Sequence, residues 1–147
     1  MESTANTSSQ KQRFATYTGR CSWFGGPHDN GVAPHEGLAL YNISEVAHYP
    51  DLFLPQQPVG TSGAARRLNP DKYYCAMRWN YHLTPQKYLR DIKVKVTNSK
   101  GVSVFVNPVD WGPNIDTHRI VDLSPGVLKA LDLTTNDNVT VEVPLPG

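Results

Sequence analysis

Two aspartates stand at positions where a side chain could carry out acid-base chemistry. Asp110 follows a run of alternating valines and stands between Pro108 and Gly112-Pro113, so its carboxyl group is expected on a rigid turn where a strand ends. Asp122 comes just before Ser124-Pro125, a pair typical of a helix start. Each has a plainer alternative, because Asp110 could accept turn hydrogen bonds and Asp122 could bind helix-start amides.

The stretch 25–37 holds four further side chains that could bind a metal ion: His28, Asp29, His35 and Glu36. Their spacing is irregular and the stretch is rich in glycine and proline, so an exposed loop with solvated side chains is favoured over a metal site. We therefore expect no metal and no cofactor.

These side chains must be positioned by short strands. Aromatic and β-branched residues predict strands over 14–24 and 73–81, and apolar and polar residues alternate in 92–97, 102–106 and 139–143. Residues 98–101 predict a turn that makes a hairpin of the middle pair. Ser124-Pro125 predicts a short helix through residue 131, Thr84-Pro85 a helical turn through residue 89, and Ser44 could cap another before Pro50.

A chain of five to seven short strands closes into a barrel or packs as a sandwich, because open strand edges invite aggregation. Residues 1–12 contain almost nothing apolar, so we expect a disordered lead over 1–13 and one domain over 14–147.

Composition argues against two classes of partner. Lysine and arginine number 14 and aspartate and glutamate 13, a formal net charge of +1, so the basic excess of a nucleic-acid binder is missing. No apolar run is long enough to span a membrane, and the N-terminus has no signal-peptide core. We expect a soluble chain with no membrane span, either cytoplasmic or a mature form without its signal.

Two cysteines, Cys21 and Cys75, allow one disulfide, and neither lies in a zinc-binding spacing. Two buried free thiols are the alternative, and the sequence does not decide between them.

Several motifs in order along the chain resemble the double-psi β-barrel family of rare lipoprotein A, expansins and barwin-like endoglucanases. The stretch Ala15-Thr16-Tyr17-Thr18-Gly19 resembles the opening strand of bacterial expansins. The pieces that resemble rare lipoprotein A are VKVTN, Gly101, VSVFV, Asp110-Trp111-Gly112-Pro113, Val121-Asp122-Leu123-Ser124 and VLKAL. The resemblance covers most of 14–143 and is weakest between 27 and 72.

The resemblance implies a six-stranded double-psi β-barrel, mainly β with one or two short helices, whose open groove binds a cell-wall glycan. It implies a lytic transglycosylase-like activity on peptidoglycan, with Asp110 as general acid and Asp122 as partner carboxylate. A shared low-dielectric cleft raises one carboxyl pKa and leaves a proton donor at neutral pH. It also implies a secreted or cell-envelope protein, expected as a monomer.

Further residues are candidates for contacting the glycan. The resemblance points to Thr16 and Thr18 on the first strand and to Asp29 in the loop that borders the groove. Aromatic faces suit sugar rings, which makes Tyr17, Trp79, Tyr81 and above all Trp111 candidates, although core packing is favoured for Trp79. Arg78 and Arg119 could contact an acidic substrate or form ordinary ion pairs.

One position departs from the rare lipoprotein A pattern. The family carries Ala-His-Arg upstream of the VxVTN strand, whereas this chain has Ala76-Met77-Arg78. His82 could supply an imidazole from a shifted position. Two alternatives to an enzyme therefore stay open: an expansin-like module that binds glycan without cutting it, and a barwin-like inhibitor or defence protein that binds a protein partner.

Overall fold

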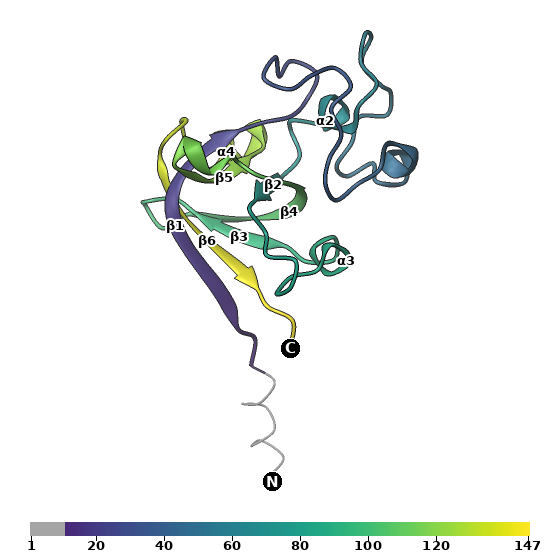
Figure 1. Ribbon diagram of the computed structural model, residues 1–147. Helices are drawn as coiled ribbons and strands as arrows, with labels where there is room; N and C mark the ends of the chain where they lie inside the picture. Colours follow the sequence, from purple (N-terminus) through teal and green to yellow (C-terminus); the bar gives the residue numbers. More distant parts are fainter. Residues whose placement is uncertain (1–10) are drawn as a thin grey trace.

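The computed structural model describes residues 11–147, and most of the predicted disordered lead lies outside this range. Six strands form a closed barrel (Figure 1). They are β1 (Phe14–Trp23), β2 (Tyr74–Met77), β3 (Val94–Thr97), β4 (Ser103–Trp111), β5 (Arg119–Leu123) and β6 (Asn138–Pro144). The prediction of a mainly β chain closed into a six-stranded barrel is confirmed.

The barrel is mixed in strand direction. Around the barrel the order is β1-β5-β2-β4-β3-β6, and β6 closes it by pairing with β1. The pairs β1·β5 and β2·β4 are parallel, whereas the other four pairs are antiparallel. Both parallel pairs require long crossovers, because parallel strands cannot be joined by a tight turn.

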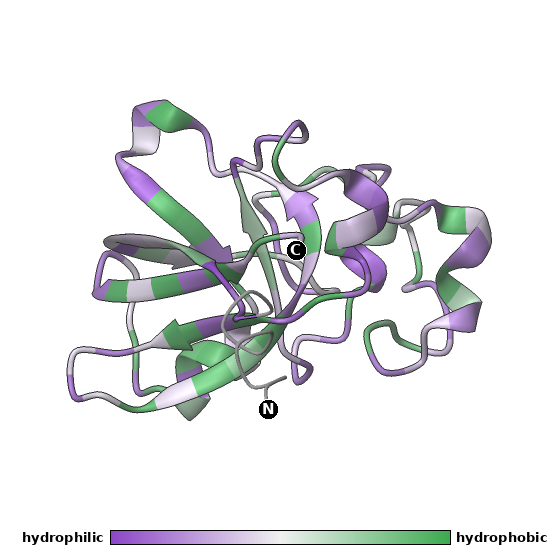
Figure 2. Ribbon diagram, turned by 90° about the horizontal axis from the view of Figure 1, so that it is seen from below, coloured by the Kyte–Doolittle hydropathy of each residue, from purple (hydrophilic) through white to green (hydrophobic). Residues whose placement is uncertain are grey.

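Side-chain alternation explains the core. Apolar and polar segments alternate along the strands in Figure 2, as expected where one face of each strand points into a barrel. The fully buried residues include Val94, Val96, Val106, Val109, Val121, Leu123 and Val141. Residues between them point outward, which sets the outer face on which the site is built.

The helices are short. The helix predicted after Ser124 is confirmed as α4 (Pro125–Ala130), with the Ser124 side chain accepting from the N–H of Val127. The turn after Thr84 is confirmed as α3 (Gln86–Leu89), but its N-cap is Pro85, so the prediction of Thr84 as cap and Pro85 as first helical residue is wrong by one position. The 3-10 helix η1 (Ile43–His48) is capped by Asn42, so the prediction of Ser44 as cap is wrong.

Two helical segments were not predicted: α2 (Ala64–Arg67) and the 3-10 helix η2 (Ile115–Thr117). None of the helices within 11–147 combines the length and apolar character needed to cross a bilayer.

Strand β2 is shorter than the predicted 73–81. The chain leaves the sheet after Met77 and forms a turn in which the N–H groups of Leu83 and Thr84 donate to the carbonyl of Asn80. The Asn80 side chain accepts from the N–H of His82. Aromatic residues at 79 and 81 therefore lie in a turn, because local hydrogen bonds to Asn80 replace the ladder.

Residues 25–72, between β1 and β2, form a side lobe next to the barrel (Figure 1). Its apolar residues include Tyr41, Val46 and Phe53, which belong to the same buried cluster as the barrel interior. Arg66 donates two hydrogen bonds to the carbonyl of Val32, which ties the middle of the lobe to its beginning. The lobe forms one wall beside the candidate site.

Cys21 and Cys75 are both buried free thiols. The disulfide considered from the sequence is therefore not formed, and the alternative of two buried thiols describes the structure.

Candidate functional site

Asp110 and Asp122 lie on two different strands that flank the same residue of β2. Ala76 pairs with Asp110 of β4 on one side and with Asp122 of β5 on the other. Residues directly paired across a sheet share a face, so both carboxylates and the Ala76 methyl group point to the same side. Neighbouring strands are about 4.8 Å apart, so the two aspartate backbones are separated by about 10 Å.

The local sequence explains this placement. Val109, which precedes Asp110 on β4, is fully buried inside the barrel, and so are Val121 and Leu123 on either side of Asp122 on β5. Both aspartates therefore point outward. The register of β2 against β4 shifts between Cys75 and Ala76, and this irregularity brings Asp110 level with Ala76.

Asp110 is partly buried and held in place by backbone groups. Its Oδ1 accepts from the N–H of Ala39 in the side lobe at 2.8 Å and from the N–H of Trp111 at 2.9 Å. The pKa of this carboxyl lies above its ordinary value, because burial, with the nearby Glu36 charge, raises it more than the two hydrogen bonds lower it. The hydrogen bonds stabilise the charged form and leave Oδ2 without a donor among residues 11–147.

Asp122 has a different environment. It is also partly buried, yet within the described part of the chain no hydrogen bond stabilises its charged form. Burial raises its pKa from 3.8 to about 6. Arg119 and Arg78 act against this rise, whereas the charges of Asp110 and Asp29 add to it. Of the two carboxyl groups, Asp122 therefore has the pKa closer to neutral pH.

Asp29 organises the loop that approaches the pair. Its side chain is buried, with Oδ2 accepting from the N–H of Gly25 at 2.7 Å and Oδ1 from the N–H of Gly31 at 2.8 Å. Both oxygens are occupied by the protein itself. Asp29 thus fixes the loop and adds negative charge near Asp122, rather than presenting a free carboxylate to a ligand.

The residue that follows Asp110 carries an exposed aromatic ring, which pairs with Met77 and points to the other side of β4. Trp111 is 47% exposed, and its Nε1 donates to the carbonyl of Trp79 at 3.0 Å, which fixes the ring orientation. Trp79 in turn donates from Nε1 to the carbonyl of Asp110 at 2.8 Å. The two indoles therefore hold each other and the end of β4, with Trp79 buried, as the core-packing alternative predicts.

Arg78 connects this region to the loop after β4. Its Nη1 donates to the carbonyls of Pro113 and Arg119, at 2.9 and 2.7 Å. Together with Trp111 and Ile115 it borders an open hollow at the end of β4. Arg119 donates to the Asn136 side chain. The contacts of both arginines are thus made within the protein.

Three predicted contacts on β1 lie elsewhere. Thr16 and Thr18 pair with Glu142 and Thr140 of β6, and the two threonine hydroxyls of 18 and 140 are 3.2 Å apart. Ser22 is the β1 residue level with Asp122, so Thr18 lies roughly 13 Å further along the strand. Tyr17 faces the opposite side and lines a pocket at the barrel end.

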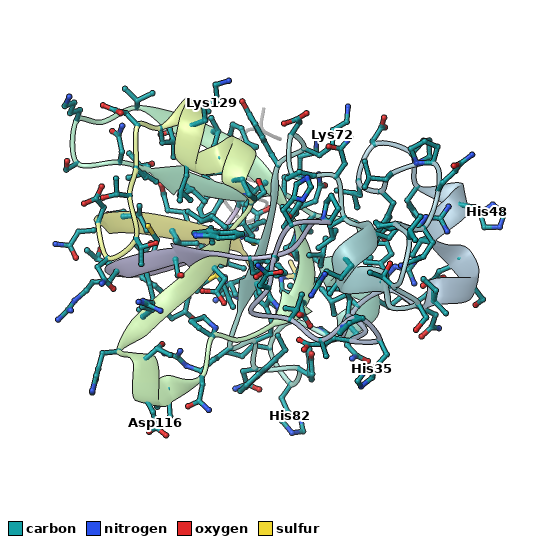
Figure 3. All side chains as sticks on the ribbon, turned by 90° about the horizontal axis from the view of Figure 1, so that it is seen from above. His35, His48, Lys72, His82, Asp116 and Lys129 are labelled. Carbon is teal, nitrogen blue, oxygen red and sulfur yellow. The ribbon has the colours of Figure 1, made fainter. Side chains whose placement is uncertain are left out.

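The structure also places the residues considered for an imidazole. His82 is exposed in the turn after β2 and projects from the periphery of the molecule in Figure 3. Tyr81 lies beside it in the same turn, half-buried against the core. Met77 follows Ala76 on β2 and lines the barrel-end pocket, so residue 77 points away from the face that carries the two aspartates.

Among residues 11–147 no group of three or more potential ligands could hold a metal ion. Glu36 accepts from the N–H of Ala33, while His28 and His35 are exposed. Two residues important for the site carried no signal of their own in the sequence: Ala76, which separates the carboxylates, and Ala39, whose backbone holds Asp110. Their roles depend on register and on a backbone group, and neither follows from residue type.

The chain matches no model of a known protein family and no curated protein sequence, so the likeness to the barrel family rests on the motifs quoted above and on the fold.

Proposed function

We propose that the protein acts on a cell-wall polysaccharide, with peptidoglycan as the first candidate, through the face that carries Asp110 and Asp122. The observation that carries the proposal is the unequal carboxyl pair on either side of Ala76. The closed barrel with two parallel strand pairs is compatible with the double-psi topology that the motifs imply. That topology belongs to the proposal as well.

The contacts of the two aspartates favour a division of roles. Asp122 has a pKa of about 6 and no internal donor, so it suits the general acid that protonates the leaving glycosidic oxygen. Asp110 accepts two backbone hydrogen bonds and suits the charged partner. This assignment reverses the order that the sequence predicts, in which Asp110 is the acid.

The surroundings support a bound sugar chain. Trp111 pairs with Met77 and therefore points away from the aspartate face. Its exposed ring, fixed by its bond to Trp79, offers a flat apolar face to a sugar unit at the end of β4 rather than between the carboxylates. A lytic transglycosylase needs only one acid, because the sugar's own hydroxyl closes onto the anomeric carbon.

Digestion of purified sacculi, with mass analysis of the products, tests this proposal. We expect anhydro-sugar ends from the wild type, and loss of product with Asp122→Asn, which has the same shape but no proton to give. Asp110→Asn should reduce the rate less, because its Oδ1 still accepts the two backbone bonds. Asp116→Asn, on the exposed η2, is the matched control. Product release that survives Asp122→Asn would contradict the assigned acid.

A second candidate is a module that binds glycan without cutting it, favoured by the fixed and exposed Trp111 ring. It predicts that the protein sediments with sacculi, releases nothing, and loses affinity with Trp111→Ala but not with Asp122→Asn. The same digestion and a sedimentation assay distinguish the two functions.

A further inference from the structure

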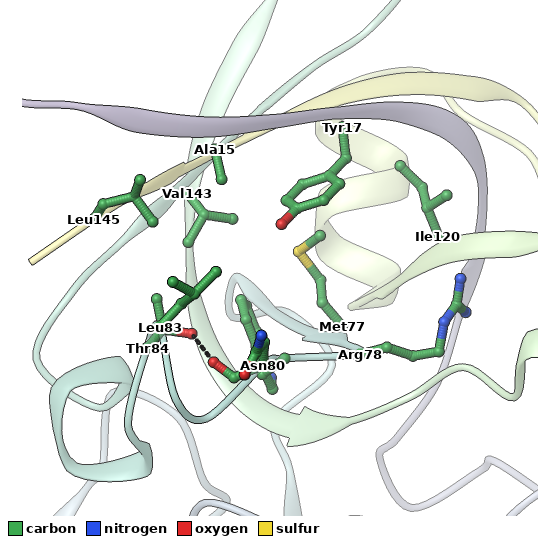
Figure 4. A pocket seen from close by; sticks show the side chains of 11 residues that line it. Ala15, Tyr17, Met77, Arg78, Asn80, Leu83, Thr84, Ile120, Val143 and Leu145 are labelled. Carbon is green, nitrogen blue, oxygen red and sulfur yellow. Dashed lines mark hydrogen bonds between the residues drawn. The ribbon is translucent and has the colours of Figure 1, made fainter.

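One hollow with a mainly apolar lining is separate from the face that carries the aspartates. It lies at the barrel end and encloses about 200 Å³. We call it the barrel-end pocket, and its apolar lining includes Ala15, Tyr17, Met77, Leu83, Val143 and Leu145. Figure 4 shows Tyr17 and Met77 pointing toward one another on one side of it.

The barrel topology leaves this pocket open. Strand β1 pairs with β5 only from Arg20 onward, whereas its first half, from Phe14, pairs with β6 alone. Within 11–147, the other edge of this first half of β1 has no neighbouring strand. There the turn after β2, through Leu83, lines the pocket opposite β1 without closing it. Apolar side chains that would otherwise be covered by a neighbouring strand therefore face solvent: Leu83 is 56% exposed and Tyr17 is 45% exposed.

We infer that the barrel-end pocket binds one neutral aromatic ring. The size fits, because an apolar cavity of about 150 Å³ in another protein holds benzene. The lining chemistry also fits, since the Met77 thioether and the Tyr17 ring both favour contact with aromatic edges and faces.

The polar groups at the pocket argue for a neutral ligand. Arg78 is the one charged residue of the lining, and its Nη1 is already used by the carbonyls of Pro113 and Arg119. Asn80 also lines the pocket, and its side-chain oxygen accepts from the N–H of His82. Its amide nitrogen donates to no acceptor within residues 11–147, so it can bind a ring hydroxyl. A phenol meets both requirements.

The pocket is connected to the carboxylate face through one side chain. Trp79 lines the pocket, and its Nε1 donates to the carbonyl of Asp110. A ring in the pocket would therefore contact the indole that holds the end of β4. The inference does not depend on the proposed polysaccharide activity.

Titration of the full chain with phenol, followed by amide and methyl NMR shifts, tests the inference. We expect saturable shifts at Ala15, Met77, Leu83 and Val143, and weaker binding of cyclohexanol, which has a similar size but no aromatic faces. Benzylammonium and benzoate should also bind more weakly because each carries a charge. Ala15→Phe, which fills the pocket, should weaken phenol binding by about tenfold or more.

Two further variants keep the test decisive if Ala15→Phe disturbs the fold. Tyr17→Leu removes one aromatic wall and should weaken phenol binding several-fold while the NMR spectrum stays folded. Phe105→Leu changes another exposed ring, on β4 outside the pocket, and should bind phenol as the wild type does. Non-saturable shifts spread over other exposed rings, equal binding of cyclohexanol, or unchanged binding by a folded Tyr17→Leu would overturn the inference. None of these results depends on whether sacculi are cut.

Discussion

Asp110 and Asp122 point to the same side of the barrel but differ in their hydrogen bonds. Oδ1 of Asp110 accepts from two backbone N–H groups, whereas no residue within 11–147 donates to Asp122. Two carboxyl groups that are partly buried to a similar degree therefore differ in how well their charged forms are stabilised.

The raised pKa of Asp122 should make stability depend on pH. Its pKa in the folded state, about 6, lies above the ordinary value of 3.8, so the folded protein binds more protons than the unfolded chain between these two values. Stability contributed by this group is present below pH 4 and is lost as the pH rises through 6.

Asp122→Asn removes that loss and should therefore stabilise the protein at pH 7.5 but not at pH 3.5. Two pKa units correspond to roughly 3 kcal/mol, and partial exposure reduces the expected gain to about 1–2 kcal/mol. Urea unfolding at both pH values measures the gain. Asp116→Asn, which changes an exposed carboxylate, should have little effect at either pH. An equal gain at both pH values would show that the pKa of Asp122 is not the cause.

The hydrogen bond between Asp110 and Ala39 should control exchange at one backbone amide. Asp110→Ala removes the acceptor, and we expect the Ala39 amide to exchange with solvent about tenfold faster or more, because the lobe edge loses its anchor. Asp110→Asn keeps the Oδ1 acceptor and should change the rate much less. Hydrogen exchange measured by NMR provides both rates.

The neighbouring Leu40 amide is the internal control, since it donates to the backbone carbonyl of Val109, which neither substitution removes. If the Leu40 and Ala39 amides speed up together in Asp110→Ala, the whole lobe edge opens, and the specific role of the carboxylate is wrong.

The sequence patterns predicted the elements whose structure depends on residues close together in the chain. Strands β3, β4 and β6 alternate because one face points into the barrel, and Ser124 caps α4 through its own side chain. The side lobe escaped prediction because its contacts are distant in sequence, such as that between Arg66 and the carbonyl of Val32.

The candidate site was predicted in residue type but not in arrangement. Neighbouring residues in the sequence marked Asp110 and Asp122 as candidates. Their common pairing with Ala76 depends on a register shift, which residue types do not predict. Thr16 and Thr18 match the family motif, but they lie on the part of β1 that pairs with β6, away from the carboxylates. How far these threonines lie from residues on another strand depends on the strand register in the folded barrel.

The buried thiols should be unreactive in the folded protein. Burial is the main cause that raises the pKa of Cys21, to about 11, with the charge of Asp137 adding to it, and burial also raises the pKa of Cys75. Since the thiolate is the reactive form, iodoacetamide at pH 8 should modify neither residue in the native state and both in guanidinium. Intact mass measures the number of adducts. If the protein stays unmodified after unfolding in guanidinium without reductant, the two cysteines form a disulfide.

Gly126 should tolerate no side chain, although it lies in a helix where alanine is normally better by about 1 kcal/mol. A Cβ there would come within 2.8 Å of the Asp71 carbonyl and 2.9 Å of the Pro70 carbonyl, and the Gly126 N–H donates to Pro70 at 2.7 Å. Gly126→Ala must therefore push α4 away from the end of the side lobe, at a cost of roughly 1–3 kcal/mol. Lys129→Ala, on the exposed side of the same helix, should change the free energy of unfolding by less than about 0.5 kcal/mol. Urea unfolding of both variants measures the contrast, and a Gly126→Ala protein as stable as the wild type would mean that α4 does not pack this closely against residues 70 and 71.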